Sequence, residues 1–318
     1  MVGIHHPSSF ILHPSSFILP MPLDHTDSNG FYPLTRVLPM VGNPVGENPI
    51  DLLFNRFFER KQAPYRFMKF HVKSPDDLGV CVAGARKMGF AGFAITVPYK
   101  IAIVPLCDEI EPASAGVGAV NFITFEGPDR RAVGKNTDGI AICSSIQQKH
   151  SIEGKHFLIL GAGGAARGIG AEIARQGAAS ITVAARDPEK SAPVAQAFRH
   201  FGRTDFATQT IPWTGPLKIP VGTDVVLNTT PVGAFPESGE LDLDWDSLAT
   251  VAMAVDVITG PRTTHFLRKA HALGLITADG VDMLVDIVHV GLEGFGVTVP
   301  REEIDAYARE LSGESLTK

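Results

Sequence analysis

The sequence predicts an α/β protein with two lobes, and three observations lead to this fold class. The chain has 318 residues, more than one average domain holds. Short apolar runs of strand length alternate with amphipathic segments of helix length from about residue 35 to the C-terminus. One apolar run is followed at once by a glycine-rich turn, GAGGAA at residues 161–166. Together these features are typical of parallel sheets covered by helices.

The first part of the chain shows the alternation clearly. We expect strands at residues 37–41, 65–70, 93–96 and 120–125. We expect helices at residues 49–59, 76–88, 99–106 and 138–148. The first helix places Ile50, Phe54 and Phe57 on one face, and the second begins after Ser74 and ends at Gly89.

The second part repeats the pattern around the glycine turn. Strands are predicted at residues 157–160, 180–184, 206–209, 224–228 and 253–257. Helices are predicted at residues 164–176, 188–201, 263–273, 280–294 and 302–311. The helix from Gly280 comes too late to complete the second sheet, so we expect the C-terminal helices to return to the first lobe. The predicted domains are residues 31–139 plus 280–318, and residues 140–279.

The N-terminal 30 residues are predicted to be a poorly ordered extension. The heptad HPSSFIL at residues 6–12 is repeated at residues 13–19, and it lacks the basic start and long apolar run of a signal peptide.

Composition excludes several classes of function. The net charge of −6 gives no reason to expect nucleic acid or an anionic membrane as a partner. No apolar run approaches the roughly 20 residues of a membrane span. Cys81, Cys107 and Cys143 are widely spaced in apolar segments, which predicts reduced thiols and a cytoplasmic location. The histidines are scattered, so no metal site is predicted.

The glycine turn predicts a Rossmann-type dinucleotide site. Gly161 permits the tight turn, Gly163 lets a pyrophosphate approach the backbone, and Ala166 allows close packing of helix on strand. Gly164 and Ala165 begin a helix whose free N–H groups would face the phosphates. A glycine turn with nothing bound is the alternative, which the preceding strand and following helix make less favourable.

The end of the second strand of this lobe indicates which dinucleotide binds. Arg186 lies where NAD-binding proteins usually carry an acidic residue, and its guanidinium would bind the 2′-phosphate of NADP. Asp187 precedes Pro188, which is typical of a helix N-cap rather than of a ribose contact. Lys190 is a second candidate contact to the phosphate. The alternative for Arg186 is an ordinary surface arginine.

Several motifs together resemble the shikimate dehydrogenase family. They are GFAGFAITVPYK at residues 89–100, GAVN at 118–121, GKNTDG at 134–139, the turn at 161–167, NTTPVG at 228–233 and, more weakly, GVDMLV at 280–285. The resemblance covers about four fifths of the chain. It implies a substrate-binding lobe, an NADP lobe, and hydride transfer between NADP and a ring hydroxyl in the cleft between them.

The resemblance also assigns roles to individual residues. The family's catalytic pair corresponds to Lys100 and Asp138. Thr96 and Asn121 correspond to residues that bind substrate or position the lysine. The nicotinamide end would be lined by Asn228, Thr229 and Gly233. Chemistry supports the pair independently, because oxidation of an alcohol needs a group to take the hydroxyl proton, and a carboxylate would orient the lysine.

The departures from the family concentrate where the substrate binds. The family's Ser-x-Ser-Pro segment, whose hydroxyls hold the substrate carboxylate, is replaced by GNPVGENP at residues 42–49. Glu47 would repel a carboxylate if it faced inward. The family's glutamine, tyrosine and asparagine at three further positions are Ile287, Thr259 and Ala94 here. Either Asn48 and its neighbours replace the serines, or the preferred substrate has changed.

Three functions therefore stay open. The main hypothesis is a shikimate dehydrogenase-like enzyme with NADP, a small-molecule substrate, and a monomeric or homodimeric state. The second is a relative that acts on quinate or another cyclic hydroxy acid. The third is a non-catalytic NADP-binding sensor, against which retention of both Lys100 and Asp138 argues.

Overall fold

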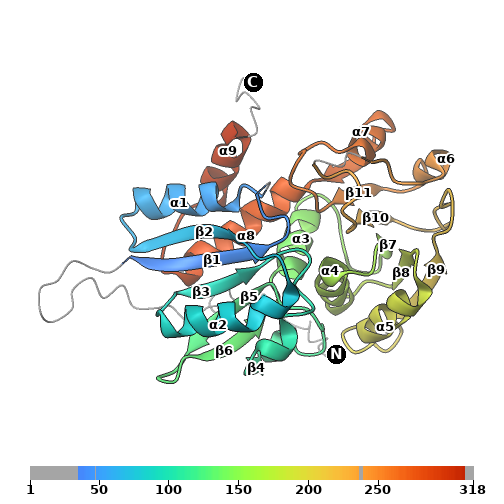
Figure 1. Ribbon diagram of the computed structural model, residues 1–318. Coiled ribbons are helices and arrows are strands. Elements are labelled where there is room, and N and C mark those ends of the chain that lie inside the picture. The colour runs from blue at the N-terminus through green and yellow to red at the C-terminus, as the bar shows by residue number, and fades with distance from the viewer. Residues whose placement is uncertain (1–34, 47, 236–238, 312–318) are drawn as a thin grey trace, which may run out of the picture.

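The computed structural model describes residues 35–46, 48–235 and 239–311, which form two lobes with a six-stranded sheet in each (Figure 1). The predicted α/β class with two lobes is confirmed. The predicted extension at residues 1–30 and the position of Glu47 lie outside the described residues.

The first lobe is built on a mixed sheet. Its strands, in spatial order, are β2 (Tyr65–His71), β1 (Arg36–Gly42), β3 (Gly92–Ile95), β5 (Phe122–Glu126), β6 (Arg131–Lys135) and β4 (Glu109–Ile110). β1 pairs in parallel with β2 and β3, whereas β5 is antiparallel to β3 and β6. Helices α1 (Ile50–Arg60) and α2 (Leu78–Lys87) cover opposite faces of this sheet (Figure 1).

The second lobe is a doubly wound parallel sheet. Its strand order is β12 (Ile276–Ala278), β11 (Met253–Asp256), β10 (Val225–Asn228), β7 (His156–Leu160), β8 (Ser180–Ala185) and β9 (Ala207–Pro212). The helices around it are α4 (Gly164–Arg175), α5 (Pro188–Phe198), α6 (Trp245–Leu248) and α7 (His265–Ala272). The strand order reverses between β7 and β10, and ligands of such sheets bind outside the carboxyl ends of the strands at that point.

Three helices connect the lobes and close the chain: α3 (Asp138–Gln147), α8 (Gly280–Gly294) and α9 (Arg301–Leu311). On α8, Leu284, Val288 and Leu292 are buried in the core that contains α1 and β1, so the predicted return to the first lobe is confirmed (Figure 1). Two contacts tie α3 and the turn that follows it to α8: Ser145 donates to Asp286 at 2.8 Å, and the Lys149 ammonium donates to Asp282 at 2.7 Å.

One predicted helix is wrong. Residues 99–106 form consecutive turns that end in a single 3₁₀ turn at Val104–Leu106. Pro105 has no N–H to continue an α-helix, and the bonds here run mostly over three residues, as from Val104 N–H to the Ile101 carbonyl. The short elements β4, β6, β12 and α6 are not predicted from the sequence. Each has two to five residues, too few to show a period.

Candidate active site

Lys100 and Asp138 form a buried ion pair. Lys100 follows β3 across a tight turn, and Asp138 is the first residue of α3. The Lys100 Nζ lies 2.6 Å from Asp138 Oδ2, with side chains 12% and 2% exposed. The other carboxylate oxygen accepts a hydrogen bond from Asn121 Nδ2 at 2.8 Å. Both carboxylate oxygens of Asp138 are therefore bonded, and Asp138 orients the Lys100 ammonium.

Asn121 also fixes the entry to α3. Its amide donates to Thr137 Oγ1 at 3.0 Å, and its carbonyl oxygen accepts from the Thr137 backbone N–H at 2.9 Å. Asn121 is predicted to bind substrate or to position the lysine; in the structure it hydrogen-bonds Asp138, which in turn contacts Lys100.

Close contacts between glycines and side chains bring the two lobes together at this pair. A Cβ added at Gly164, the first residue of α4, would lie 2.8 Å from Lys100 Cβ. One added at Gly168 would lie 2.3 Å from Asn136 Oδ1, and one at Gly139 would lie 2.4 Å from the Gly168 carbonyl oxygen. Because Gly139, Gly164 and Gly168 carry no side chain, α4 contacts Lys100 and the start of α3 directly.

The ion pair lies in a cavity of about 690 Å³ to which both lobes contribute. Its lining includes the predicted site residues Lys100, Asp138, Thr96, Asn121, Asn48, Ala165 and Thr229. Thr96 directly follows β3 and lines the same cavity as the pair. The Asn48 side-chain oxygen accepts a hydrogen bond from the Ile50 backbone N–H at 3.0 Å, so it stabilises the start of α1.

The glycine turn after β7 has the geometry that a dinucleotide requires. Gly161 has φ +107°, which favours glycine, and a Cβ added at Gly163 would meet no atom within 4 Å. Ala166 is fully buried under the turn. The N-terminal N–H groups of α4 therefore face open space at the carboxyl end of β7, and the residues present fit a dinucleotide pyrophosphate.

Arg186 and its neighbours lie at the end of β8. Arg186 is exposed, and the Asp187 side chain accepts from the Glu189 backbone N–H at 3.0 Å, as an N-cap does. The prediction that Asp187 is a cap is confirmed. Lys190 is exposed and pairs with Asp187 at 3.3 Å, so a phosphate would have to compete with that carboxylate for its ammonium.

The segment after β10 corrects one predicted contact. Asn228 is fully buried; its amide donates to Asp256 at 3.1 Å, and its oxygen accepts from Thr230. It shapes the turn and does not line the nicotinamide end, because β10 and the turn itself enclose it. Thr229 does line the cavity, while Gly233, with φ +102°, is buried below the surface of the turn.

Asp256 is a residue that the sequence analysis missed. It ends β11, is fully buried, and accepts hydrogen bonds from Asn228, Thr264 and the Ile258 backbone N–H. Burial raises the pKa of Asp256 to about 6, against the lowering effect of those hydrogen bonds. A carboxylate at the end of an apolar strand was the signal in the sequence. Through Asn228 it holds the turn that carries Thr229.

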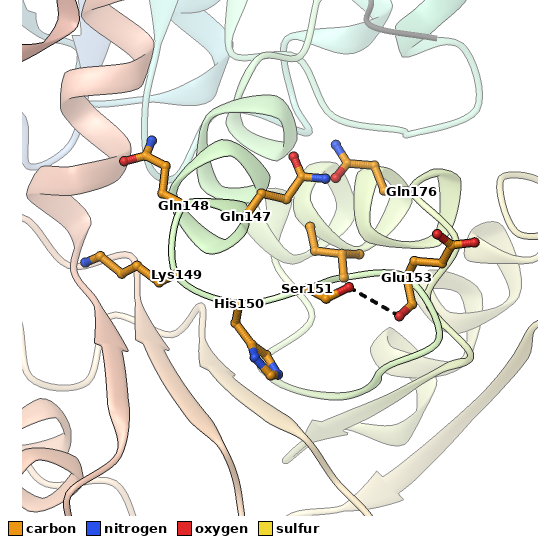
Figure 2. A pocket seen from close by; sticks show the side chains of 8 residues that line it. Gln147, Gln148, Lys149, His150, Ser151, Glu153 and Gln176 are labelled. Atoms are coloured by element: carbon orange, nitrogen blue, oxygen red, sulfur yellow. Dashed lines mark hydrogen bonds between the residues drawn. The ribbon is translucent and has the colours of Figure 1, made fainter. Parts of the chain in front are cut away.

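A second hollow lies at the end of α3, away from the ion pair. It has a volume of about 610 Å³ and is lined by Gln147, Gln148, Lys149, His150, Ser151, Ile152, Glu153 and Gln176 (Figure 2). Its side chains spread apart, and the only bond drawn between them joins Ser151 to the Glu153 carbonyl at 3.5 Å. This hollow brings together no acid–base pair.

Two other kinds of site are absent from residues 35–46, 48–235 and 239–311. No group of three or more metal-ligating side chains gathers there. No helix in these ranges has the length and apolar content needed to cross a membrane.

Known proteins resemble this chain over most of its length. The family model described as the shikimate dehydrogenase substrate binding domain matches residues 40–123. The shikimate dehydrogenase (NADP(+)) of Geobacter metallireducens is 37% identical over 260 residues, covering 79% of this chain and 87% of the relative. The enzyme of the same name from Moorella thermoacetica is 33% identical, covering 88% and 95%.

Solved structures show the same similarity. A 5-ketofructose reductase of Gluconobacter sp. strain CHM43 has a TM-score of 0.76 and 30% identity, covering 87% of this chain and 99% of that one. A shikimate dehydrogenase solved in complex with NADP⁺ has a TM-score of 0.76 and 28% identity, covering 89% and 96%.

Proposed function

Since the chain belongs to the shikimate dehydrogenase family and is an NADP-dependent oxidoreductase acting on a CH–OH group, we propose that it interconverts shikimate and 3-dehydroshikimate reversibly. The observation that carries this proposal is the Lys100–Asp138 ion pair, 2.6 Å long, inside a cavity shared by both lobes.

Lys100 is the proposed proton carrier. In the direction of reduction its ammonium donates a proton to the carbonyl oxygen as that atom gains negative charge. In the direction of oxidation the neutral amine takes the hydroxyl proton. Asp138 orients the ammonium and stabilises its charge, and Asn121 holds the second oxygen of Asp138. NADP, when bound, supplies the hydride acceptor, and its reduced form the hydride donor.

The cofactor would bind along the turn after β7. The open face of Gly163 and the N–H groups at Gly164 and Ala165 would bind the pyrophosphate. Gly161 and Ala166 give the turn its shape, Arg186 would bind the 2′-phosphate, and Thr229 would contact the nicotinamide end.

Initial rates with shikimate and NADP⁺ test the proposal, measured for the wild type, Lys100→Met and the exposed control Lys87→Met. We expect the rate to fall by about 10²–10⁴-fold in Lys100→Met, as for loss of an acid–base group, and to persist in the control. NADPH binding, followed by fluorescence, should survive in all three proteins. NADPH binding by a wild type that does not turn over shikimate would refute the proposal and indicate another substrate. NADPH binding without turnover of any cyclic hydroxy acid would favour the sensor hypothesis.

The names of the relatives leave the substrate range open, because one of them is named for 5-ketofructose. A paralogue acting on quinate or another cyclic hydroxy acid is the second candidate. The proposed domains stay residues 31–139 plus 280–318 and residues 140–279. The proposed state is a cytoplasmic monomer or homodimer.

A further inference from the structure

Arg167 is a half-buried arginine that has no partner within the part of the chain that the structure describes. It lies near the start of α4, three residues after Gly164. Its Nε atom is buried without a hydrogen-bond partner, and no described carboxylate pairs with its guanidinium. Burial lowers the pKa of Arg167, and no neighbouring carboxylate opposes that effect. A buried cation is costly unless it is paired, so a bound anion would supply a partner that the chain itself does not provide.

The guanidinium lies at the boundary between the lobes. A Cβ added at Gly118, in the loop before β5, would lie 3.2 Å from Arg167 Nη1. In the same loop the Val120 backbone N–H donates to the Lys100 carbonyl oxygen at 2.7 Å. Lys100 is also the residue that Gly164 contacts. Arg167 therefore meets the first lobe next to the catalytic lysine, on the side of the N-terminal end of α4.

The face of α4 that carries Arg167 is turned away from the nicotinamide end. Successive residues of a helix are about 100° apart, so Arg167 lies roughly opposite Ala165, which lines the cavity. Arg175 lies on the same face as Arg167, and its guanidinium is 5.0 Å from the ring centroid of Phe201, just after α5. Since α5 follows β8, this face is directed toward the side of the lobe where β8 ends at Arg186. The adenosine half of a dinucleotide would bind on that side.

Arg167 is also placed along the helix so that it can reach a phosphate. It lies four residues after the N-cap Gly163, which is about 6 Å along the helix axis. Helical side chains point back toward the N-terminus, and an arginine is long enough to cover this distance. Gly163 faces open space where the pyrophosphate would bind. A guanidinium binds two phosphate oxygens at once, which suits this position.

We propose that Arg167 binds the pyrophosphate of NADP from the adenosine side while its guanidinium contacts the first lobe at Gly118. The inference rests on the proposed cofactor site at the turn after β7 and adds a residue to that site. It does not depend on which cyclic hydroxy acid is the substrate. NAD contains the same pyrophosphate, so loss of Arg167 weakens the binding of both nucleotides, whereas loss of Arg186 weakens the binding of NADP alone.

Fluorescence titrations with NADPH and with NADH test the proposal through the Kd of each nucleotide. They compare the wild type, Arg167→Met and the control Arg175→Met. Arg175 shares the face of α4 and donates to the Ala113 carbonyl oxygen of the first lobe at 2.9 Å, but it lies at the far end of the helix. We expect both Kd values to rise by about ten- to hundredfold in Arg167→Met and to stay close to the wild-type values in the control.

Three results would overturn the inference: weakening confined to NADPH, no weakening, or equal weakening in Arg167→Met and Arg175→Met. Equal weakening would show that packing between the lobes, and not a phosphate contact, is what both arginines provide. A wild type that binds neither nucleotide would refute the proposed cofactor site together with the inference.

Thermal unfolding separates a ligand-binding role of Arg167 from a structural one. Methionine keeps most of the apolar stem of arginine, and no ion pair of Arg167 within the described residues is lost, so Arg167→Met should keep the wild-type Tm without nucleotide. At one fixed NADPH concentration the rise in Tm should be smaller in the variant than in the wild type. A variant with a lower Tm without nucleotide and an undiminished rise with NADPH would show a purely structural arginine, and the inference would fail.

Discussion

Replacing Gly164 by alanine tests whether the contact between α4 and Lys100 sets the catalytic geometry. The added Cβ would lie 2.8 Å from Lys100 Cβ, 3.5 Å from Cδ and 3.6 Å from Cγ. Carbon atoms pack at about 3.5–4.0 Å, so the lysine must move by roughly 0.7 Å or more. Displacements of about 1 Å at a reacting group cost about 10²-fold in rate. We therefore expect kcat to fall by about ten- to hundredfold.

The adjacent glycine provides the control. Gly163→Ala places its methyl group in open space, where the cofactor phosphates would bind, with no described atom within 4 Å. It should raise KM for NADP and leave kcat close to that of the wild type. Steady-state kinetics with both substrates, together with thermal unfolding to confirm the fold, separate the two effects. Gly164→Ala that keeps the wild-type kcat and raises only KM for NADP would refute the reasoning.

Three other predictions follow from separate features. Asp256, with a pKa of about 6 in the folded protein against an ordinary value of 3.8, holds a proton between these values that the unfolded chain has released. Its contribution to the free energy of unfolding should therefore fall by about 2 kcal/mol as pH rises from 4 to 6. Urea titrations of Asp256→Asn should show no such slope. In Gly168→Ala the added Cβ would lie 2.3 Å from the Asn136 side-chain oxygen, so the free energy of unfolding should fall by about 1–3 kcal/mol, measured by thermal unfolding. In the control Gly84→Ala the nearest atom to the added Cβ lies at 3.6 Å, so the free energy of unfolding should not fall. Arg186→Ala should raise KM for NADP by about ten- to hundredfold, and a proportional rise for NAD would show that it does not bind the 2′-phosphate.

Local chemistry made much of the second lobe predictable. The turn at residues 161–166 combines a glycine with φ +107° and a buried alanine, and both requirements are visible as residue types. The Asp187 cap was predictable for the same reason, since a short side chain before a proline accepts a hydrogen bond from the backbone N–H two residues on. Long helices with one apolar face, such as α1, were also located within one or two residues.

Features that depend on the partner of a side chain were not predictable. Asn43 and Asn48 have the residue type for binding a substrate, yet their side-chain oxygens contact His71 and the Ile50 backbone N–H, respectively. Asn228 likewise hydrogen-bonds to Asp256, which lies 28 residues away in sequence. Sequence shows which groups are available for hydrogen bonding, whereas only the fold shows which of them are already used.

The bonds between α3 and α8 have a consequence for motion. The chain crosses between the lobes at these two helices; Ser145–Asp286 joins them, and Lys149–Asp282 joins α8 to the turn just after α3. A rotation of one lobe on the other would have its axis near this pair of helices, and displacement increases with distance from an axis. Asp138 begins α3, so it would move little, while Val97 and Phe235 at the cavity edge would separate. The Lys100–Asp138 ion pair would thus stay intact during opening. Each catalytic cycle would need to readjust only the distance between hydride donor and acceptor.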